Sequence, residues 1–139
     1  MKGIIFAILT SFMWGISPIL FKLGLKGQVN TVLALFIHNL SAGLLALGIL
    51  ALYVRSFDIP INQLFILASG GIVAGFLGLY FYFKSVSNAP ISVVAPIVAS
   101  SPLWSSLLAV LIFGESMSLK KLTGIIFVVS GIIILSLER

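Results

Sequence analysis

Few residues in this sequence could do chemistry, and His38 is the foremost of them. It is the only histidine in the 139-residue chain, which has no cysteine. It falls inside a long apolar run, roughly 13 Å along the helix expected over 29–54. An ionisable side chain within a membrane-spanning run is costly and marks functional sites, and the ordinary histidine pKa of about 6.5 suits proton coupling. We interpret His38 either as a solute- or proton-binding group or as a hydrogen-bonding contact between helices.

A polar face is predicted on the first apolar run. Thr10, Trp14 and Ser17 recur at i, i+4 and i+7 and therefore share one face of a helix. Pro18 removes the hydrogen bond to the carbonyl of Trp14 and favours a kink there. A kinked, polar face with an aromatic ring suits a binding site at the membrane midplane. Alternatively, the hydroxyls only bond the preceding turn of their own helix.

A second polar, broken stretch lies later in the chain. Pro96 and Pro102 fall within one apolar run and free backbone carbonyls that need partners in the protein or in a water-filled cavity. Broken helices of this kind are typical of transporter binding sites, although packing alone can also require a kink. Tyr80 is read either as a membrane-interface aromatic or as a ligand contact. The candidate solute-binding residues are Trp14, Ser17, His38, Tyr80, Ser101 and Trp104.

The acidic residues offer little chemistry. The chain has three, Asp58, Glu115 and Glu138, all in expected loops or at the tail. We expect Glu115 to pair with Lys120 or Lys121. The lack of cysteine excludes thiol chemistry, and no nucleophile elbow accompanies the single histidine. We therefore predict neither an enzyme nor a metal or cofactor site.

The elements that position these residues must lie in lipid. Hydrophobic residues make up 60% of the chain and charged residues 8%, against about 25% charged in a soluble domain. So few charges cannot build a water-facing surface. The basic residues that give a net charge of +5 are scattered between apolar runs. They indicate membrane-interface anchors rather than a nucleic-acid partner.

Five stretches reach the roughly 20 apolar residues that a spanning helix needs. They are expected at 3–25, 29–54, 63–83, 89–113 and 122–137. The last is short and would need local thinning of the bilayer or snorkelling by Lys121 and Arg139. Asn30, Asn62 and Ser118 are predicted helix caps, and no cleaved signal peptide is expected. The predicted fold is an all-α membrane bundle of five helices forming one domain over 1–139.

Glycines predict close helix packing within this bundle. Gly71 and Gly75 form a small-xxx-small pair that Gly78 extends, and Gly124 shares a face with Gly131. Such faces let helices approach closely in lipid, where van der Waals contact drives association.

The basic residues give no preferred orientation. With five spans, one membrane face would carry Lys2, Arg55, Lys120 and Lys121, and the other Lys22, Lys26, Lys84 and Arg139. Lysine and arginine favour the cytoplasmic side, so an equal division leaves two readings. Either Lys22 is partly buried and the bias is simply weak, or copies insert in both orientations and pair antiparallel.

Several motifs resemble an EamA-type domain of the drug/metabolite transporter superfamily over essentially the whole chain. The opening motif is Leu9-Thr10-Ser11-Phe12-Met13-Trp14-Gly15-Ile16-Ser17-Pro18, followed by Lys22. The later motifs are Tyr82-Phe83-Lys84-Ser85-Val86-Ser87-Asn88-Ala89-Pro90, Val94-Ala95-Pro96, Ser101-Pro102-Leu103, Phe113-Gly114-Glu115, Gly124 and Ser130-Gly131. At the family's usual arginine of the second helix this chain carries His38, which puts arginine-dependent carboxylate binding in doubt.

The resemblance implies one half of a ten-helix, inverted-repeat transporter of the cytoplasmic membrane. Relatives move amino acids, other metabolites or drugs, usually outward, and this half implies a homodimer, parallel or antiparallel, or a second single-domain protein as partner. The chain is also similar in size to small multidrug resistance proteins, but its first helix lacks their acidic residue. We expect a secondary transporter of a small metabolite or drug. The alternative is a non-transporting accessory or assembly subunit of a membrane complex.

Overall fold

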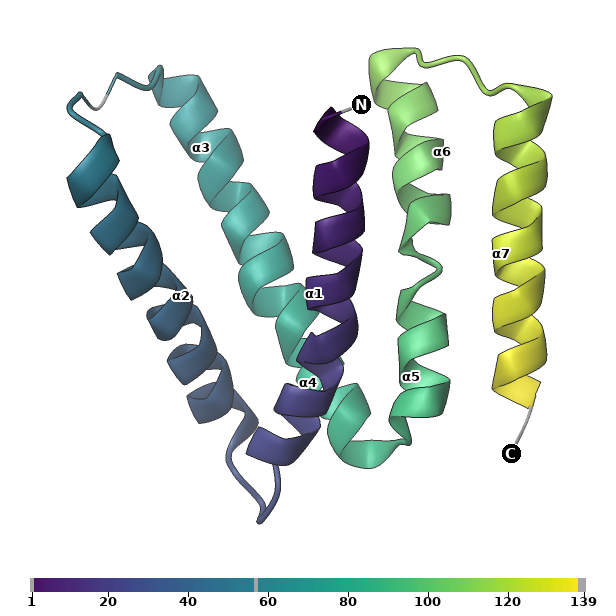
Figure 1. Cartoon of the computed structure of the whole chain (residues 1–139), viewed down its shortest axis with the longest axis horizontal. Coiled ribbons are helices and arrows are strands. Elements are labelled where there is room, and N and C mark those ends of the chain that lie inside the picture. The colour runs from purple at the N-terminus through teal and green to yellow at the C-terminus, as the bar shows by residue number, and fades with distance from the viewer. Residues whose placement is uncertain (1, 57, 138–139) are drawn as a thin grey trace. The chain divides into compact units, whose positions relative to one another are not determined.

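The computed structural model describes residues 2–56 and 58–137, which are helical throughout apart from short connections and contain no strand. The helical segments are α1 (Lys2–Gly24), α2 (Thr31–Tyr53), α3 (Ile61–Gly70), η1 (Gly71–Gly78), α4 (Leu79–Asn88), α5 (Ile91–Val98), α6 (Ser101–Phe113) and α7 (Leu119–Leu137) (Figure 1). They form two compact units, Met1–Asn88 and Ala89–Arg139. Each unit is described by itself.

The segments join into five helices, of which four are long and apolar enough to cross a membrane. These four are Gly3–Gly24, Thr31–Tyr53, Ile61–Asn88 and Ile91–Phe113. The third runs beyond the expected range of 63–83 at both ends, because α3, η1 and α4 follow one another without a break. The fifth helix, α7, has 19 residues and begins at Leu119, with both lysines in its first turn. Its crossing of the membrane stays a prediction.

Large apolar side chains point outward on every long helix. Among the described hydrophobic residues, only Leu35, Phe83, Val86 and Val94 have buried side chains, whereas residues such as Phe12, Leu45, Leu67 and Phe127 are exposed. In water such a surface would aggregate. In lipid it is the ordinary exterior of a helical bundle, so the all-helical membrane fold predicted from composition is confirmed.

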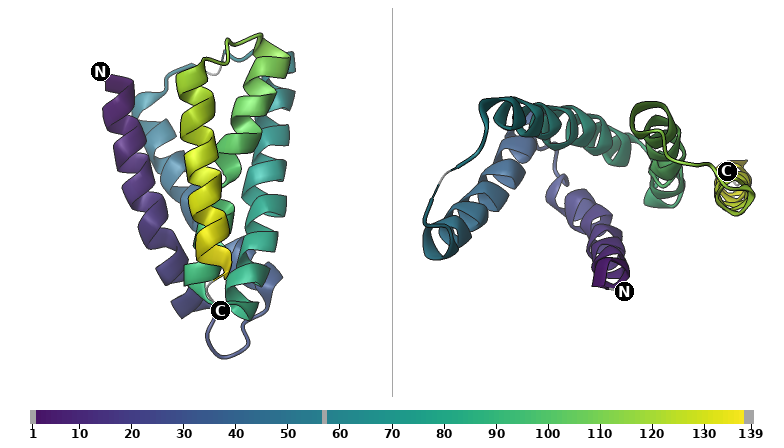
Figure 2. Two further views of the ribbon diagram at one scale, coloured as in Figure 1. Left: turned by 90° about the vertical axis from the view of Figure 1, so that its right-hand side faces the viewer. Right: turned by 90° about the horizontal axis from the view of Figure 1, so that it is seen from above.

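The first unit is held together at one end. There α4 contacts both α1 and α2, and the ends of these helices away from α4 lie farther apart (Figure 1, Figure 2). The buried residues of this unit are Pro18 on α1, Leu35 on α2, and Phe83 and Val86 on α4. Packing of this kind stabilises helix contacts in lipid, where apolar burial gives no advantage over the acyl chains.

Two of the three predicted helix caps are confirmed. The Asn30 side chain accepts hydrogen bonds from the backbone N–H groups of Val32 and Leu33, at 2.8 and 3.2 Å. The Ser118 hydroxyl accepts one from the N–H of Lys121 at 3.3 Å. The prediction for Asn62 was wrong, because the helix begins at Ile61, directly after Pro60, so that Asn62 lies in its first turn.

An unusual segment interrupts the third long helix. Residues Gly71–Gly78 form a π-helix, whose hydrogen bonds span one residue more than those of an α-helix. The four glycines in and beside it, Gly70, Gly71, Gly75 and Gly78, make the wider turn sterically easy. At Gly78 a Cβ would lie 3.3 Å from the carbonyl oxygen of Val73. Segments of this type recur at functional sites.

In the second unit, the fourth long helix is broken as its prolines predict. The α-helix stops at Val98 and restarts at Ser101, with Pro102 in the first turn of α6. The turn between them keeps its own hydrogen bonds: Ser100 N–H donates to the Ile97 carbonyl at 3.1 Å, and Leu103 N–H to the Ser100 carbonyl at 2.9 Å. Helix α7 packs against α5, before the break, and contacts α6 only sparsely.

Helix α6 ends in a left-handed glycine, which gives a testable expectation. Gly114 has a φ of 63°, and its N–H and that of Glu115 bond the carbonyls of Val110 and Ala109 at 3.1 and 3.4 Å. Gly114→Ala should lower the free energy of unfolding by about 1–2 kcal/mol, since a Cβ clashes in this conformation. Gly114→Asn should cost less, because asparagine tolerates it better.

Thermal unfolding in detergent, followed by circular dichroism, measures the effect. The matched control is Gly43→Ala, within α2, where an added Cβ meets nothing within 4 Å. That change should be neutral or slightly stabilising, because alanine favours helix. Equal losses for the two variants would contradict the expectation.

Candidate functional site

The first unit contains a cavity of about 190 Å³, open on one side, at its packed end. Its lining comes from the end of α1, the connection to α2, the first turns of α2, and α4. The residues are Leu20, Phe21, Gly24, Leu25, Val29, Ala34, Ile37, His38 and Phe83. Every one of them is apolar except His38. The cavity is therefore an apolar space with a single hydrogen-bonding side chain on its wall.

Aromatic rings surround that side chain. The His38 ring meets the rings of Phe21 and Phe83 edge to face, with centroids 5.2 and 6.0 Å apart. Phe21 also contacts Phe83 at 4.8 Å and Tyr82 at 5.9 Å. Edge-to-face contacts of this kind hold rings in a fixed orientation. The half-buried imidazole is thus positioned by two aromatic rings, Phe21 from α1 and Phe83 from α4.

This arrangement can bind a solute in two ways. The imidazole can donate or accept one hydrogen bond or exchange a proton, and the aromatic faces can stack on a planar group or attract a cation. His38 lies about 10 Å from the start of α2 at 1.5 Å per residue. That depth is inside the roughly 30 Å hydrocarbon layer. A polar solute group paired with His38 would therefore be bound away from the membrane surface.

The next residue, Asn39, bonds to the π-helical segment. Its side-chain amide donates to the carbonyl of Gly75 at 2.8 Å. A Cβ added at Gly75 would lie 3.6 Å from the Asn39 side-chain oxygen, an ordinary van der Waals contact. His38 and Asn39 thus contact different elements, because side chains one residue apart on a helix point in different directions.

The predicted residues on α1 do not enter this cavity. The hydroxyls of Thr10 and Ser17 donate to the carbonyls of Phe6 and Met13, four residues back, at 2.8 and 2.9 Å. This is the alternative in which they bond only the preceding turn. Trp14 is 73% exposed. Of the α1 residues, the structure instead places Phe21, one turn beyond Ser17, against His38.

Tyr80 lies on α4 in a separate aromatic group. Its ring stacks with Phe76 at 6.4 Å and meets Phe81 at 5.7 Å. The ammonium of Lys84 lies 6.0 Å from the Tyr80 ring centroid, within range of a cation–π contact. A lysine beside a tyrosine near the end of a spanning helix is typical of the membrane interface.

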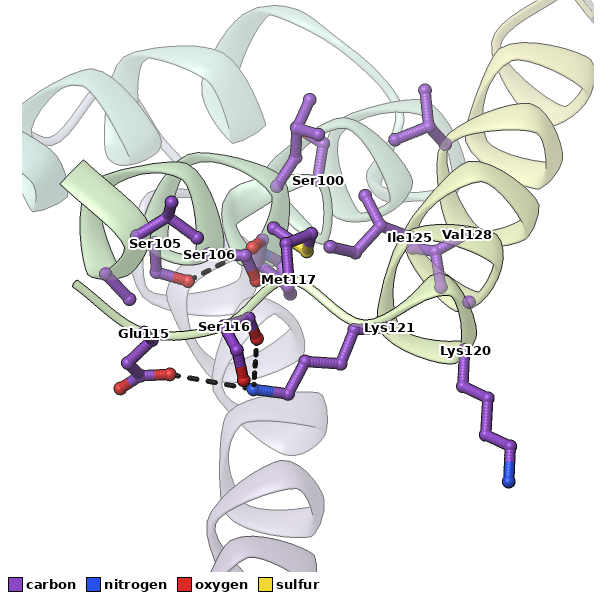
Figure 3. A pocket seen from close by; sticks show the side chains of 16 residues that line it. Ser100, Ser105, Ser106, Glu115, Ser116, Met117, Lys120, Lys121, Ile125 and Val128 are labelled. Carbon is purple, nitrogen blue, oxygen red and sulfur yellow. Dashed lines mark hydrogen bonds and ion pairs between the residues drawn. The ribbon is translucent and has the colours of Figure 1, made fainter.

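The second unit holds a larger groove, of about 560 Å³, between α6 and α7 (Figure 3). The candidate residues Ser101 and Trp104 belong to this unit but do not line the groove. The Ser101 carbonyl accepts a hydrogen bond from the Ser105 hydroxyl at 3.3 Å, and Trp104 is 62% exposed.

The predicted pairing of Glu115 is confirmed with Lys121. The carboxylate and the ammonium are 3.7 Å apart, with both side chains more than half exposed, and the ammonium also donates to the Ser116 carbonyl at 3.3 Å. An exposed pair of this kind is worth less than about 1 kcal/mol. Among the residues that the structure describes, no group of three His, Asp or Glu side chains could hold a metal ion.

Sequence reasoning missed Phe21, Phe83 and the role of Asn39. Phenylalanines are ordinary members of an apolar run, so their grouping around His38 is visible only once α1, α2 and α4 are packed. Asn39 did carry a signal. A carboxamide inside an apolar helix needs a hydrogen-bond partner, and the glycine-rich stretch 70–78 is where a backbone carbonyl can be reached.

The comparison with known families decides the wider assignment. The sequence profile of the EamA-like transporter family matches residues 1–137. The chain belongs to this family. Its EamA-like fold and apolar helices make it a multi-pass membrane protein with lipid as its surroundings, and the family is one of transporters.

Curated relatives agree with the assignment. The chain is 25% identical over 138 residues to an "Uncharacterized transporter" of Archaeoglobus fulgidus, covering 97% of this chain and 48% of the relative. It is also 25% identical over 138 residues to an "Uncharacterized transporter" of Clostridium kluyveri, covering 95% and 43%. The chain thus spans less than half the length of these relatives. No solved structure shows a significant match.

Proposed function

We propose that the protein is a secondary transporter that moves a small metabolite or drug across the cytoplasmic membrane, as an exporter or facilitator. The observation that carries this proposal is the His38 imidazole, held by aromatic rings on the wall of an apolar cavity at membrane depth. Placing an ionisable group within the membrane costs free energy, and such groups mark functional sites. The family assignment to transporters supports the same conclusion.

The cavity suggests the kind of solute. At about 190 Å³ it is smaller than the 300–1,000 Å³ of most drug-sized pockets. It would accept one apolar or aromatic part of a solute, with a polar group paired to His38. Trp14, Ser17, Tyr80, Ser101 and Trp104 stay proposed lining residues for the rest of the solute, reached when the helices rearrange during transport. No step requires a cofactor or a covalent intermediate, and we propose no enzymatic activity.

We further propose that this five-helix chain works as a dimer with another copy of itself. Support comes from the relatives, in which the matching region fills 48% and 43% of the length. Rocking of one copy of the chain against the other would expose the solute site to each side of the membrane in turn. The equal division of basic residues allows an antiparallel arrangement.

Reconstitution into liposomes tests transport directly. Purified protein is inserted, and the uptake of labelled amino acids, nucleosides, organic cations and aromatic acids is compared with that of protein-free liposomes. We expect saturable flux of at least one compound. The absence of flux across the panel, together with tight binding to another membrane protein, would support the accessory-subunit alternative instead.

Crosslinking in the membrane tests the dimer. A C-terminal reporter that is active on one side only, measured in both compartments, tests its orientation. We expect a crosslinked species of twice the chain's mass and reporter signal from both sides. A signal from one side alone would reject antiparallel pairing of identical chains.

A further inference from the structure

The groove between α6 and α7 has features of a lipid site that the proposed transport function does not use. It lies wholly within the second unit. Helix α7 packs mainly against α5 there and contacts α6 only sparsely, which leaves the groove between α6 and α7. Its inner walls are mainly apolar, with Ser105 and Ser106 among the α6 residues. The apolar residues include Leu103, Ala109 and Val110 on α6 and Ile125, Val128 and Val129 on α7.

The groove extends about as deep as one membrane leaflet. It is lined along α7 from Lys120, in the first turn, to Val129. At 1.5 Å per residue this is about 14 Å, close to half of the roughly 30 Å hydrocarbon layer. At Gly124 an added Cβ would meet nothing within 4 Å, so there is open space in the groove beside this residue. A single acyl chain fits a groove of this depth and polarity.

Charge is concentrated at one end of the groove. Glu115, Lys120 and Lys121 line the end formed by the connection from α6 to α7. Figure 3 shows Lys121 meeting Glu115 while Lys120 reaches outward. Within the described part of the chain Lys120 makes no ion pair. Two ammonium groups and one carboxylate leave this end with one unbalanced positive charge.

We propose that this groove binds one anionic glycerophospholipid. The acyl chain lies along the apolar walls, and the phosphate pairs with Lys120. The charges match, because a phosphatidylglycerol headgroup carries one negative charge and the mouth of the groove one positive charge. The free N–H groups in the first turn of α7 add to the attraction for an anion. Basic pockets between membrane helices are a recurring form of lipid recognition.

Charge variants with opposite expected effects test this site. Native mass spectrometry of the full chain in detergent is used to titrate phosphatidylglycerol, with phosphatidylcholine as the neutral comparison. We expect one phosphatidylglycerol to bind preferentially. Lys120→Gln should weaken its binding about fivefold, and Glu115→Gln should strengthen it by a similar factor, from about 1 kcal/mol per charge near the surface. A strengthened variant cannot be explained by misfolding.

Two further variants separate the site from general charge effects. Arg55→Gln removes the same charge in the connection between α2 and α3, outside the groove, and should leave lipid binding unchanged. Gly124→Leu fills the groove without altering its charges and should weaken binding at least as much as Lys120→Gln. The proposal is overturned if Arg55→Gln matches Lys120→Gln. It is also overturned if Gly124→Leu changes the dimer fraction but not the bound lipid, since a second copy of the chain would then occupy the groove.

Discussion

Replacing His38 by phenylalanine is expected to reduce transport about tenfold to a hundredfold. The new ring keeps the edge contacts with Phe21 and Phe83 but removes the one polar group of the cavity wall. Leaving a polar group of the bound solute without its hydrogen-bond partner weakens its binding by about 1–3 kcal/mol. A loss of this size corresponds to the expected reduction in flux. The measurement is the initial flux, in liposomes, of the compound that the wild-type protein transports.

A second variant separates hydrogen bonding from proton exchange. His38→Gln keeps a donor and an acceptor but does not titrate, so it should retain part of the flux. Because an imidazole can exchange a proton and an amide cannot, we expect the flux to depend less on pH in the glutamine variant than in the wild-type protein. An unchanged pH profile in the variant would remove the proton role while leaving the binding role in place.

The control for both His38 variants is Tyr53→Phe. It removes a polar group from the same helix, at a side chain that is 80% exposed, and should leave the flux unchanged. If it reduces flux as much as His38→Phe does, the cavity is not the solute site.

Truncating Phe83 is expected to cause the largest loss of stability. Its side chain is 2% exposed, and it contacts Phe21 and His38. In soluble cores Phe→Ala costs about 3–5 kcal/mol. In lipid, packing contact rather than the hydrophobic effect holds helices together, so we expect about 3 kcal/mol, the lower end of that range. Unfolding by sodium dodecyl sulfate in mixed micelles, followed by circular dichroism, gives the free energy.

The same helix provides a matched control. Phe81→Ala removes an identical side chain two residues away, where the ring is 65% exposed and in the native membrane would contact lipid. We expect a loss below about 1 kcal/mol, because lipid replaces most of the lost contacts. Comparable losses for Phe81→Ala and Phe83→Ala would show that α4 does not organise the packed end of the first unit.

The sequence predicted helix ends and helix breaks well where residues at that point in the chain cause them. Asn30 and Ser118 cap their helices because a side-chain oxygen beside a helix start can reach free N–H groups. Pro96 and Pro102 predicted the break between α5 and α6, because proline removes a backbone donor. The cap predicted at Asn62 was wrong by two residues, because Pro60 occupies the cap position. Pro60 restricts the backbone before Ile61 and lets the helix start there.

The candidate site was predicted less well, because it depends on which helices meet. Trp14 and Ser17 share a face of α1, but a shared face does not say which neighbour it contacts. The structure uses Phe21, farther along the same helix, to contact His38. Likewise, the glycines of 70–78 permit a π-helix but do not require one, so the sequence alone did not predict it.

The sequence by itself determined that this protein lies in lipid as a bundle of apolar helices. The reason is that solvent preference and helix length follow from composition and from runs of about 20 apolar residues, with no knowledge of contacts. The tertiary structure alone decided that His38 has aromatic neighbours from α1 and α4, and that a groove separates α6 from α7. In a uniformly apolar sequence every helix face is equally acceptable to lipid, so only the packed side chains select which faces meet.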